Sequence, residues 1–165
     1  MPEFRVCAKS EVGKTVQSFG ATHLVTLLDP EDQVRRPSII EPTNHLRLAF
    51  FDEEDLSAYR PPTPWHASAI LDFGSRLPPD ARVVVHCYAG MCRSTAAGLA
   101  LWVQAHGGDC LEDGRAWLLG HRYRACPNRL LARYFDEQLK LAGRFLELCD
   151  DIGEESVIRR RKDLE

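Results

Sequence analysis

The sequence lacks the features that mark several protein classes. Its longest apolar run, Ala96 to Val103, has eight residues, whereas a membrane-spanning helix needs about 20. The N-terminus carries an acidic residue with no apolar stretch after it, so no secretory signal is predicted. Basic residues are not in excess, because 21 basic and 24 acidic side chains give a net charge of −3. We therefore expect a cytoplasmic protein with no membrane partner and no nucleic-acid partner.

The cysteines do not form the patterns of a metal site or a disulfide framework. None of the six belongs to a Cys-x-x-Cys pair, the usual spacing of structural zinc ligands. A reducing cytoplasm keeps cysteines as thiols, and most free cysteines pack as small buried hydrophobes. The sequence thus predicts neither a metal nor any other cofactor.

The length of 165 residues suits a single domain. We expect this domain to span residues 1–152. Residues 153–165 are predicted to form a charged, frayed tail, because Glu154 and Glu155 are followed by a basic run from Arg159 to Lys162.

Hydrophobic patterning predicts an α/β protein. Strands are expected at residues 4–7, 22–28, 45–50 and 81–85, and helices at 10–19, 64–77, 93–105, 109–119 and 127–149. Strands that alternate with helices imply a mostly parallel central sheet flanked by helices on both faces, which is a three-layer fold. In such sheets the ligand binds beyond the carboxyl ends of the strands.

Some side chains have expected structural roles. Ser10 and Thr63 are candidate helix N-caps, and Gly20 is placed to end the first helix in a left-handed conformation. Asp109 and Glu112 have the spacing of a capping box. The three tryptophans fall within predicted helices and are expected in the core; they are Trp65, Trp102 and Trp117.

The segment from His86 to Ser94 follows the most buried predicted strand and precedes a helix. It reads His86, Cys87, Tyr88, Ala89, Gly90, Met91, Cys92, Arg93 and Ser94. Successive backbone N–H groups that curl in front of a helix make a concave anion site. Gly90 permits the turn, and the planar guanidinium of Arg93 can hold two phosphate oxygens. The segment therefore predicts a site for phosphate or a similar oxyanion, bound by residues 88–93.

Cys87 lies at the floor of this predicted site. A positive field stabilises the thiolate form of a cysteine, which is the nucleophilic form. Ser94 can donate its hydroxyl to the sulfur and so ease the departure of the sulfur in a second step. His86 is expected to be a buried hydrogen-bonding support of the loop rather than an acid or base.

This segment resembles the active-site pattern His-Cys-x-x-Gly-x-x-Arg-Ser/Thr of the protein tyrosine phosphatase superfamily, with every fixed position matched. The resemblance covers roughly residues 23–149 and is greatest to small dual-specificity-like phosphatases, especially short bacterial ones. Pro127 and Asn128 resemble a Pro-Asn pair that follows the active-site helices in that group, which makes Asn128 a supporting residue. The resemblance implies a phosphatase that acts through a phosphocysteine intermediate on phosphorylated protein or peptide substrates.

The resemblance also implies an aspartate acid on a loop some 30 to 40 residues before the cysteine. Asp52 and Asp55 both lie in this interval. Asp52 is preferred because the strand at 45–50 leads directly into it, and Asp55 is the alternative. Asp29 lies further upstream and is interpreted as a turn residue before Pro30.

Several alternatives remain open from the sequence. Cys92 either packs behind the loop or forms a reversible disulfide with Cys87. A set of arginines forms either a solvated basic face or a flank of the pocket; they are Arg122, Arg124 and Arg129. The protein is either an enzyme or a catalytically silent phosphate-binding module. The substrate of an enzyme can be a phosphotyrosine, phosphoserine or phosphothreonine protein, a small phosphorylated metabolite or a phosphoinositide, although the absence of lysine from 88–92 disfavours the lipid headgroup.

Overall fold

The computed structural model describes all 165 residues, and its centre is a parallel sheet. Four strands lie in the order β1 (Glu3–Ala8), β4 (Arg82–Cys87), β2 (His23–Leu28) and β3 (His45–Ala49). Every neighbouring pair is parallel. The prediction of a three-layer α/β fold with a mostly parallel sheet is thus confirmed. The β-branched run Val83–Val85 lies in the interior position of the sheet and is fully buried.

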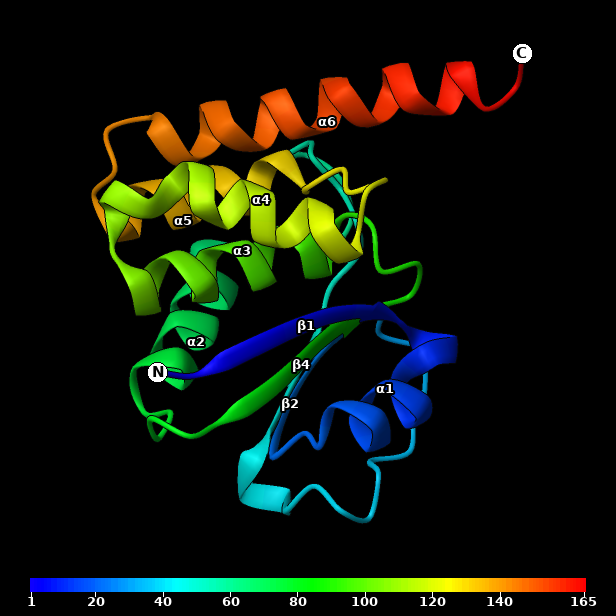
Figure 1. The fold of residues 1–165 in the computed structure, drawn as a ribbon, viewed down its shortest axis with the longest axis vertical. Helices are drawn as coiled ribbons and strands as arrows, with labels where there is room; N and C mark the ends of the chain where they lie inside the picture. The colour runs from blue at the N-terminus through cyan, green and yellow to red at the C-terminus, as the bar shows by residue number, and fades with distance from the viewer.

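The helices cover the two faces of the sheet unequally (Figure 1). Helix α1 (Val12–Phe19) packs against β1 and β4 on one face. The other face carries a stack of five helices; these are α2 (Pro64–Ser75), α3 (Arg93–His106), α4 (Leu111–His121), α5 (Arg129–Leu139) and α6 (Arg144–Lys162). Short 3-10 turns occur at Lys9–Glu11, Pro42–Asn44 and Gly108–Cys110. No helix is both long enough and apolar enough to cross a membrane.

The expected caps are found at some helix ends and not at others. Gly20 ends α1 with a φ of +67°, and Thr63 caps α2 in a reciprocal pair with His66. Ser10 does not cap, because a 3-10 turn precedes α1. The capping box predicted from Asp109 was also wrong, since no side chain caps that helix.

The helix predicted at 127–149 is two helices, α5 and α6. The chain turns between them through Lys140, Ala142 and Gly143, all at positive φ. The buried carboxylate of Asp136 accepts hydrogen bonds from the backbone N–H groups of Gly143 (2.8 Å) and Phe145 (2.8 Å). A carboxylate at the start of α6 satisfies donors that have no partner within the helix, and this stabilises the break.

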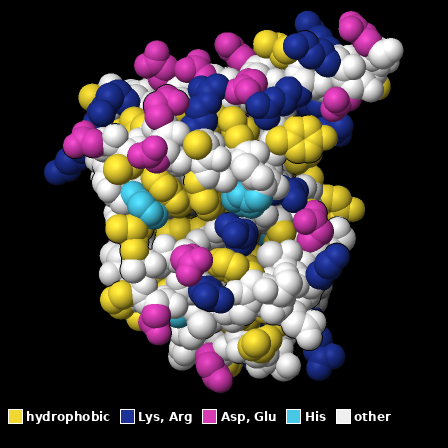
Figure 2. Space-filling view, viewed as in Figure 1, with side chains coloured by type: hydrophobic (Ala, Val, Ile, Leu, Met, Phe, Trp, Pro, Cys, Tyr) yellow, Lys and Arg dark blue, Asp and Glu magenta, His cyan; other side chains and the backbone are white.

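Helix α6 also crosses the boundary predicted at residue 152. The expected frayed tail is helical as far as Lys162, and Ser156 within it is buried and donates a hydrogen bond to the Arg124 carbonyl. Figure 1 shows the end of α6 extending past the rest of the fold, and in Figure 2 acidic and basic side chains intermingle along this edge. Among the tryptophans, Trp102 is buried as expected, whereas Trp65 is 65% exposed.

Candidate active site

The segment singled out in the sequence lies at the carboxyl edge of the sheet. Cys87 ends β4 and is buried, and α3 begins at Arg93. Between them a cleft of about 320 Å³ opens to the surface. Its lining residues are Asp29, Phe51, Asp52, Glu53, Cys87, Tyr88, Ala89, Cys92 and Arg93. The cleft thus brings together three chain segments that end near the same edge of the sheet.

The turn at Gly90 requires glycine. Its φ is +66°, and a Cβ built there would lie 2.6 Å from the backbone nitrogen of Ala8. On the same side, the Arg122 guanidinium donates from Nε to the Gly90 carbonyl (3.0 Å) and from Nη2 to the Ala89 carbonyl (3.2 Å). The sharp turn and its arginine clamp together fix the path of the loop.

The backbone donors of this loop have no acceptors within the protein. None of the N–H groups from Tyr88 to Arg93 donates a hydrogen bond to another protein group. Because backbone N–H groups are strong donors that are nearly always paired, six free ones in sequence make a cradle for an anion. The start of α3 adds the partial positive charge of a helix N-terminus.

Arg93 is a second source of positive charge, and it is only 4% exposed. Its Nη1 donates to the Asp29 carboxylate and to the Phe50 carbonyl, at 2.8 Å each. Its Nε is buried and has no hydrogen-bond partner. A buried unpaired donor on a cation is costly, so the cleft is suited to an oxyanion that accepts from it.

The Cys87 sulfur lies 3.1 Å from the hydroxyl oxygen of Ser94, in the first turn of α3. This distance permits the hydroxyl to donate to a thiolate. The arrangement matches the expected contact between these two side chains.

His86 is fully buried beneath the loop. Its Nε2 lies 2.8 Å from the hydroxyl of Thr26, which lies 2.8 Å from Nε2 of His45. Its Nδ1 lies 3.3 Å from the Cys87 carbonyl, which can only accept, so the neutral ring carries its proton on Nδ1. Burial lowers the pKa of His86 to about 4. The expected structural support is therefore present, as a neutral ring bonded across the sheet.

Asp52 and Asp55 have different surroundings. Asp52 lines the cleft, and its carboxylate accepts a hydrogen bond of 2.8 Å from the side-chain amide of Asn128. Asp55 lies outside the cleft, and its carboxylate accepts from the backbone and hydroxyl of Ser57. Those bonds lower the pKa of Asp55. Of these two aspartates, only Asp52 lines the cleft with Cys87.

Asn128 joins the loop that carries Asp52 to the anion loop. Its side-chain amide also donates to the Glu53 carbonyl (3.0 Å), and its backbone N–H donates to the Cys92 carbonyl (3.0 Å). Its side-chain oxygen accepts from the Leu131 N–H and caps α5. One buried residue thus positions both walls of the cleft.

Cys92 has a thiol neighbour other than Cys87. Its thiol shares a hydrogen bond with Cys126, and this bond, together with burial, raises the pKa of Cys92. The same hydrogen bond, helped by the charge of Arg160, lowers the pKa of Cys126 to about 6. The backbone of Cys126 is fixed beside the loop by donating to the Met91 carbonyl (2.8 Å). Both Cys87 and Cys92 are free thiols.

Two residues of the site have contacts that the sequence analysis did not anticipate. Asp29 does begin the predicted turn, since its carbonyl accepts from the Asp32 N–H (3.0 Å), but its carboxylate also pairs with Arg93 in the cleft wall. Its position just after β2, the neighbour of β4 in a parallel sheet, is the signal that would have found it. For Arg122 the sequence left open a solvated face or a flank of the pocket; the structure shows it bonded to the carbonyls of Ala89 and Gly90, a contact that no local pattern predicts. Arg124 and Arg129 do lie exposed, paired with Asp163 and Asp150.

Sequence comparison with known proteins finds a similar phosphatase. No family model matches the chain. A dual specificity protein phosphatase, MPK-4 of Drosophila melanogaster, is 32% identical over 104 residues, which make up 59% of this chain and 24% of that protein. The match therefore spans about a quarter of the length of the relative.

Solved structures align over almost the whole chain. DUSP15 aligns with a TM-score of 0.60 and 20% identity over 93% of this chain and 92% of the other. The Yvh1 phosphatase domain from Chaetomium thermophilum gives 0.59 and 19% over 84% and 91%. PTPMT1, crystallised in complex with PI(5)P, gives 0.57 and 16% over 96% and 94%. The fold is that of these dual-specificity phosphatase structures, which is the fold implied by the resemblance of residues 86–94.

Proposed function

We propose that the protein is a cysteine-dependent phosphatase that hydrolyses phosphotyrosine, and also phosphoserine or phosphothreonine, in protein substrates. The observation that carries this proposal is the buried guanidinium of Arg93, whose Nε has no partner, beside six free loop N–H groups and the Cys87 sulfur. A phosphoryl group offers the charge and the acceptor oxygens that these donors lack.

In the first step the Cys87 thiolate attacks phosphorus in line with the ester oxygen. The S–P bond forms as the P–O bond to the substrate breaks. Asp52, in its protonated form, transfers its proton to the departing oxygen, so that the product leaves as an alcohol or phenol. Arg93 and the loop amides hold the three remaining phosphoryl oxygens throughout.

In the second step the phosphocysteine is hydrolysed. Asp52, now a carboxylate, accepts a proton from water as the water oxygen attacks phosphorus. The S–P bond breaks, and Ser94 donates a hydrogen bond to the sulfur as it regains negative charge. Inorganic phosphate leaves, and both the thiolate and the protonated acid are restored.

Two neighbours position these groups without touching the substrate. Asp29 and the Phe50 carbonyl hold one nitrogen of Arg93 and leave Nε free for the phosphoryl group. Asn128 holds the carboxylate of Asp52 at the cleft and ties its loop to Cys92. A fixed geometry of this kind is what phosphoryl transfer requires from a protein.

The test is turnover of para-nitrophenyl phosphate and of a phosphopeptide panel by the wild-type protein and three variants. Cys87→Ser should abolish turnover while keeping phospholigand binding. Asp52→Asn should lower kcat by about 10²- to 10³-fold on peptides, and Asp55→Asn should not. Loss of turnover with Asp55→Asn alone would contradict the acid assignment. Binding without any turnover by the wild-type protein would instead identify a silent phosphate-binding module, and turnover of phosphoinositides alone would replace the protein substrate.

A further inference from the structure

A large hollow with a basic lining lies beside the candidate active site rather than within it. It has a volume of about 470 Å³, and three of its lining residues are the cations Lys9, Arg35 and Arg36. A hollow of about 380 Å³ adjoins it, lined by Lys9, Ser10, Val34 and Tyr88. This hollow shares Lys9 and Val34 with the basic cavity and shares Tyr88 with the cleft of Cys87. The basic cavity and this hollow therefore adjoin each other, and Tyr88 borders both the hollow and the cleft of Cys87.

The wall of the basic cavity is held in place by hydrogen bonds. Arg47, on β3, donates to the carbonyls of Asp32 (3.2 Å) and Val34 (3.3 Å). Arg36 donates to the Ile40 carbonyl in the same segment. These bonds anchor the chain on both sides of Arg35, so the cations project from a defined backbone.

The charges around the cavity are only partly compensated. Lys9 pairs with Asp32 at 3.5 Å, but neither Arg35 nor Arg36 forms an ion pair. In the cleft of Cys87, by contrast, Arg93 is paired with Asp29, and Asp52 and Glu53 also line the wall. A second negative group of a substrate is thus attracted to the unpaired cations of the basic cavity.

We propose that this basic cavity binds a second anionic side chain, a phosphate or a carboxylate, of a phosphopeptide whose phosphorylated residue occupies the cleft. The proposal rests on the proposed function and gives it a substrate class: phosphorylated proteins with acidic residues near the phosphosite. Tyr88, 61% exposed between the two anion sites, offers an apolar ring over which a peptide can lie.

The intervening hollow favours a peptide over an inositol phosphate. Phosphates on one inositol ring are fixed on carbons of a single small ring. Here a whole hollow, lined by four residues, separates the two anion sites. An extended peptide advances about 3.3 Å per residue, so a side chain a few positions away can span the gap.

The experiment measures binding of labelled peptides to the Cys87→Ser protein by fluorescence anisotropy. One phosphotyrosine peptide has neutral flanks, and the others carry glutamate or phosphoserine two to five positions away on either side. With the Arg35 side chain intact, at least one acidic peptide should bind about tenfold more tightly than the neutral peptide. The preference should shrink on raising the salt concentration.

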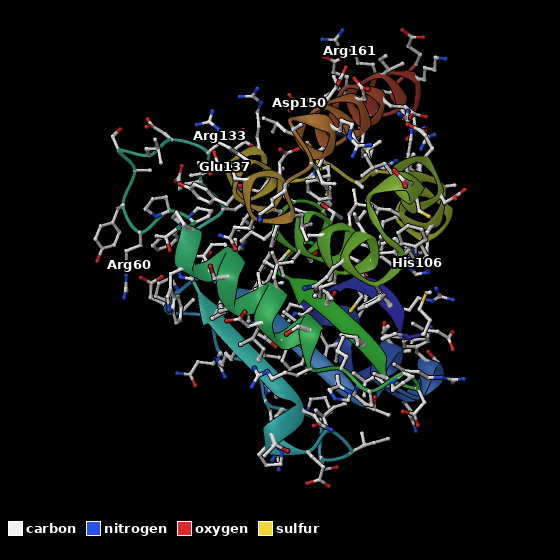
Figure 3. All side chains as sticks on the ribbon, turned by 90° about the vertical axis from the view of Figure 1, so that its left-hand side faces the viewer. Arg60, His106, Arg133, Glu137, Asp150 and Arg161 are labelled. Carbon is white, nitrogen blue, oxygen red and sulfur yellow. The ribbon has the colours of Figure 1, made fainter.

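Arg35→Gln should reduce that preference several-fold, and Arg35→Glu should remove or reverse it. Arg133→Gln is the matched control, since Arg133 is an exposed arginine that points outward from α5 (Figure 3). Equal affinities for acidic and neutral peptides, or a preference that survives Arg35→Glu, would overturn the proposal. Preference for phosphoinositide vesicles over every peptide would also overturn it.

This readout does not depend on catalysis. If the wild-type protein fails to hydrolyse para-nitrophenyl phosphate, the proposed function is wrong, yet the peptide preference of the Cys87→Ser protein still decides the subsite. If turnover is present and the preference absent, the subsite alone is wrong.

Discussion

The candidate site is built from two kinds of region, one continuous and one assembled. Residues 86–94 hold the proposed nucleophile, the proposed anion donors and the hydroxyl beside the sulfur at nine consecutive positions. The groups that hold them come from distant positions, such as Asp29 at the end of β2 and Arg122 after α4. The comparison indicates that the chemistry is encoded locally, whereas the precision of the geometry comes from tertiary contacts.

The continuous region should show the largest effects. Arg93→Ala removes the buried guanidinium that is proposed to hold the phosphoryl group, so kcat/KM should fall by about 10³-fold or more. Arg93→Lys keeps the charge but not the planar fork, and it should recover little of the loss. Steady-state kinetics on para-nitrophenyl phosphate checks this, and near wild-type activity of Arg93→Ala would remove the anion site from the proposal.

Asn128→Ala tests the strongest assembled contact. The variant loses the cap of α5 and frees the loop of Asp52, so unfolding free energy should fall by about 1–3 kcal/mol and kcat by about tenfold. Urea unfolding and kinetics report the two effects separately. Asn128→Asp keeps the cap oxygen but places a second carboxylate against Asp52, so it should restore stability better than activity. If both variants lose stability while kcat stays unchanged, Asn128 does not position the acid.

Arg122→Gln tests the clamp on the carbonyls of Ala89 and Gly90. The loop should lose order, and KM for a phosphate ester should rise several-fold with a smaller change in kcat. Arg124→Gln, two residues away and paired with Asp163 at the surface, is the matched control. Equal behaviour of these two variants would show that the clamp is dispensable.

The buried His86 should make the folding stability depend on pH. Its folded pKa of about 4 lies below the ordinary 6.5, so the unfolded chain binds the proton more readily. Stability should therefore fall as the pH drops from about 6.5 to about 4, by an amount on the order of 3 kcal/mol at most. Urea unfolding at pH 7 and pH 5 measures this loss. His86→Asn should flatten the difference, and an unchanged pH dependence would mean that other groups cause it.

The smallest effect is expected at Cys126. Because its pKa is lowered to about 6, Cys126 should react with iodoacetamide faster than Cys110 at pH 7. Cys92→Ala removes the thiol that shares its hydrogen bond, so the labelling of Cys126 should then need a higher pH. Mass spectrometry of labelled peptides measures both rates. An unchanged rate in Cys92→Ala would contradict the pairing of the two thiols.

The same comparison explains what the sequence could predict. Periodicity and β-branched runs were enough for the parallel sheet, and the spacing from His86 to Ser94 was enough for the anion loop. Asp52 was preferred over Asp55 because a strand leads directly into it, and of the two only Asp52 lines the cleft. Arg122 and the contact of Cys92 with Cys126 depend on how α4 and the segment after it fold back on the loop, which no local pattern encodes. The break between α5 and α6 was missed for a related reason, since Asp136 acts on residues that lie beyond its own helix.

The edge strand β1 contacts the turn at Gly90, so changes at the N-terminus should affect the candidate site. The Lys9 N–H donates to the Tyr88 carbonyl (3.0 Å), and the backbone of Ala8 presses against Gly90. Strand β1 and Lys9 therefore support the turn at Gly90 from outside the candidate cleft. Removal of these residues by an aminopeptidase, or a bulky affinity tag fused without a spacer, is expected to loosen the turn at Gly90. Phosphatase activity should then fall although Cys87 stays chemically intact.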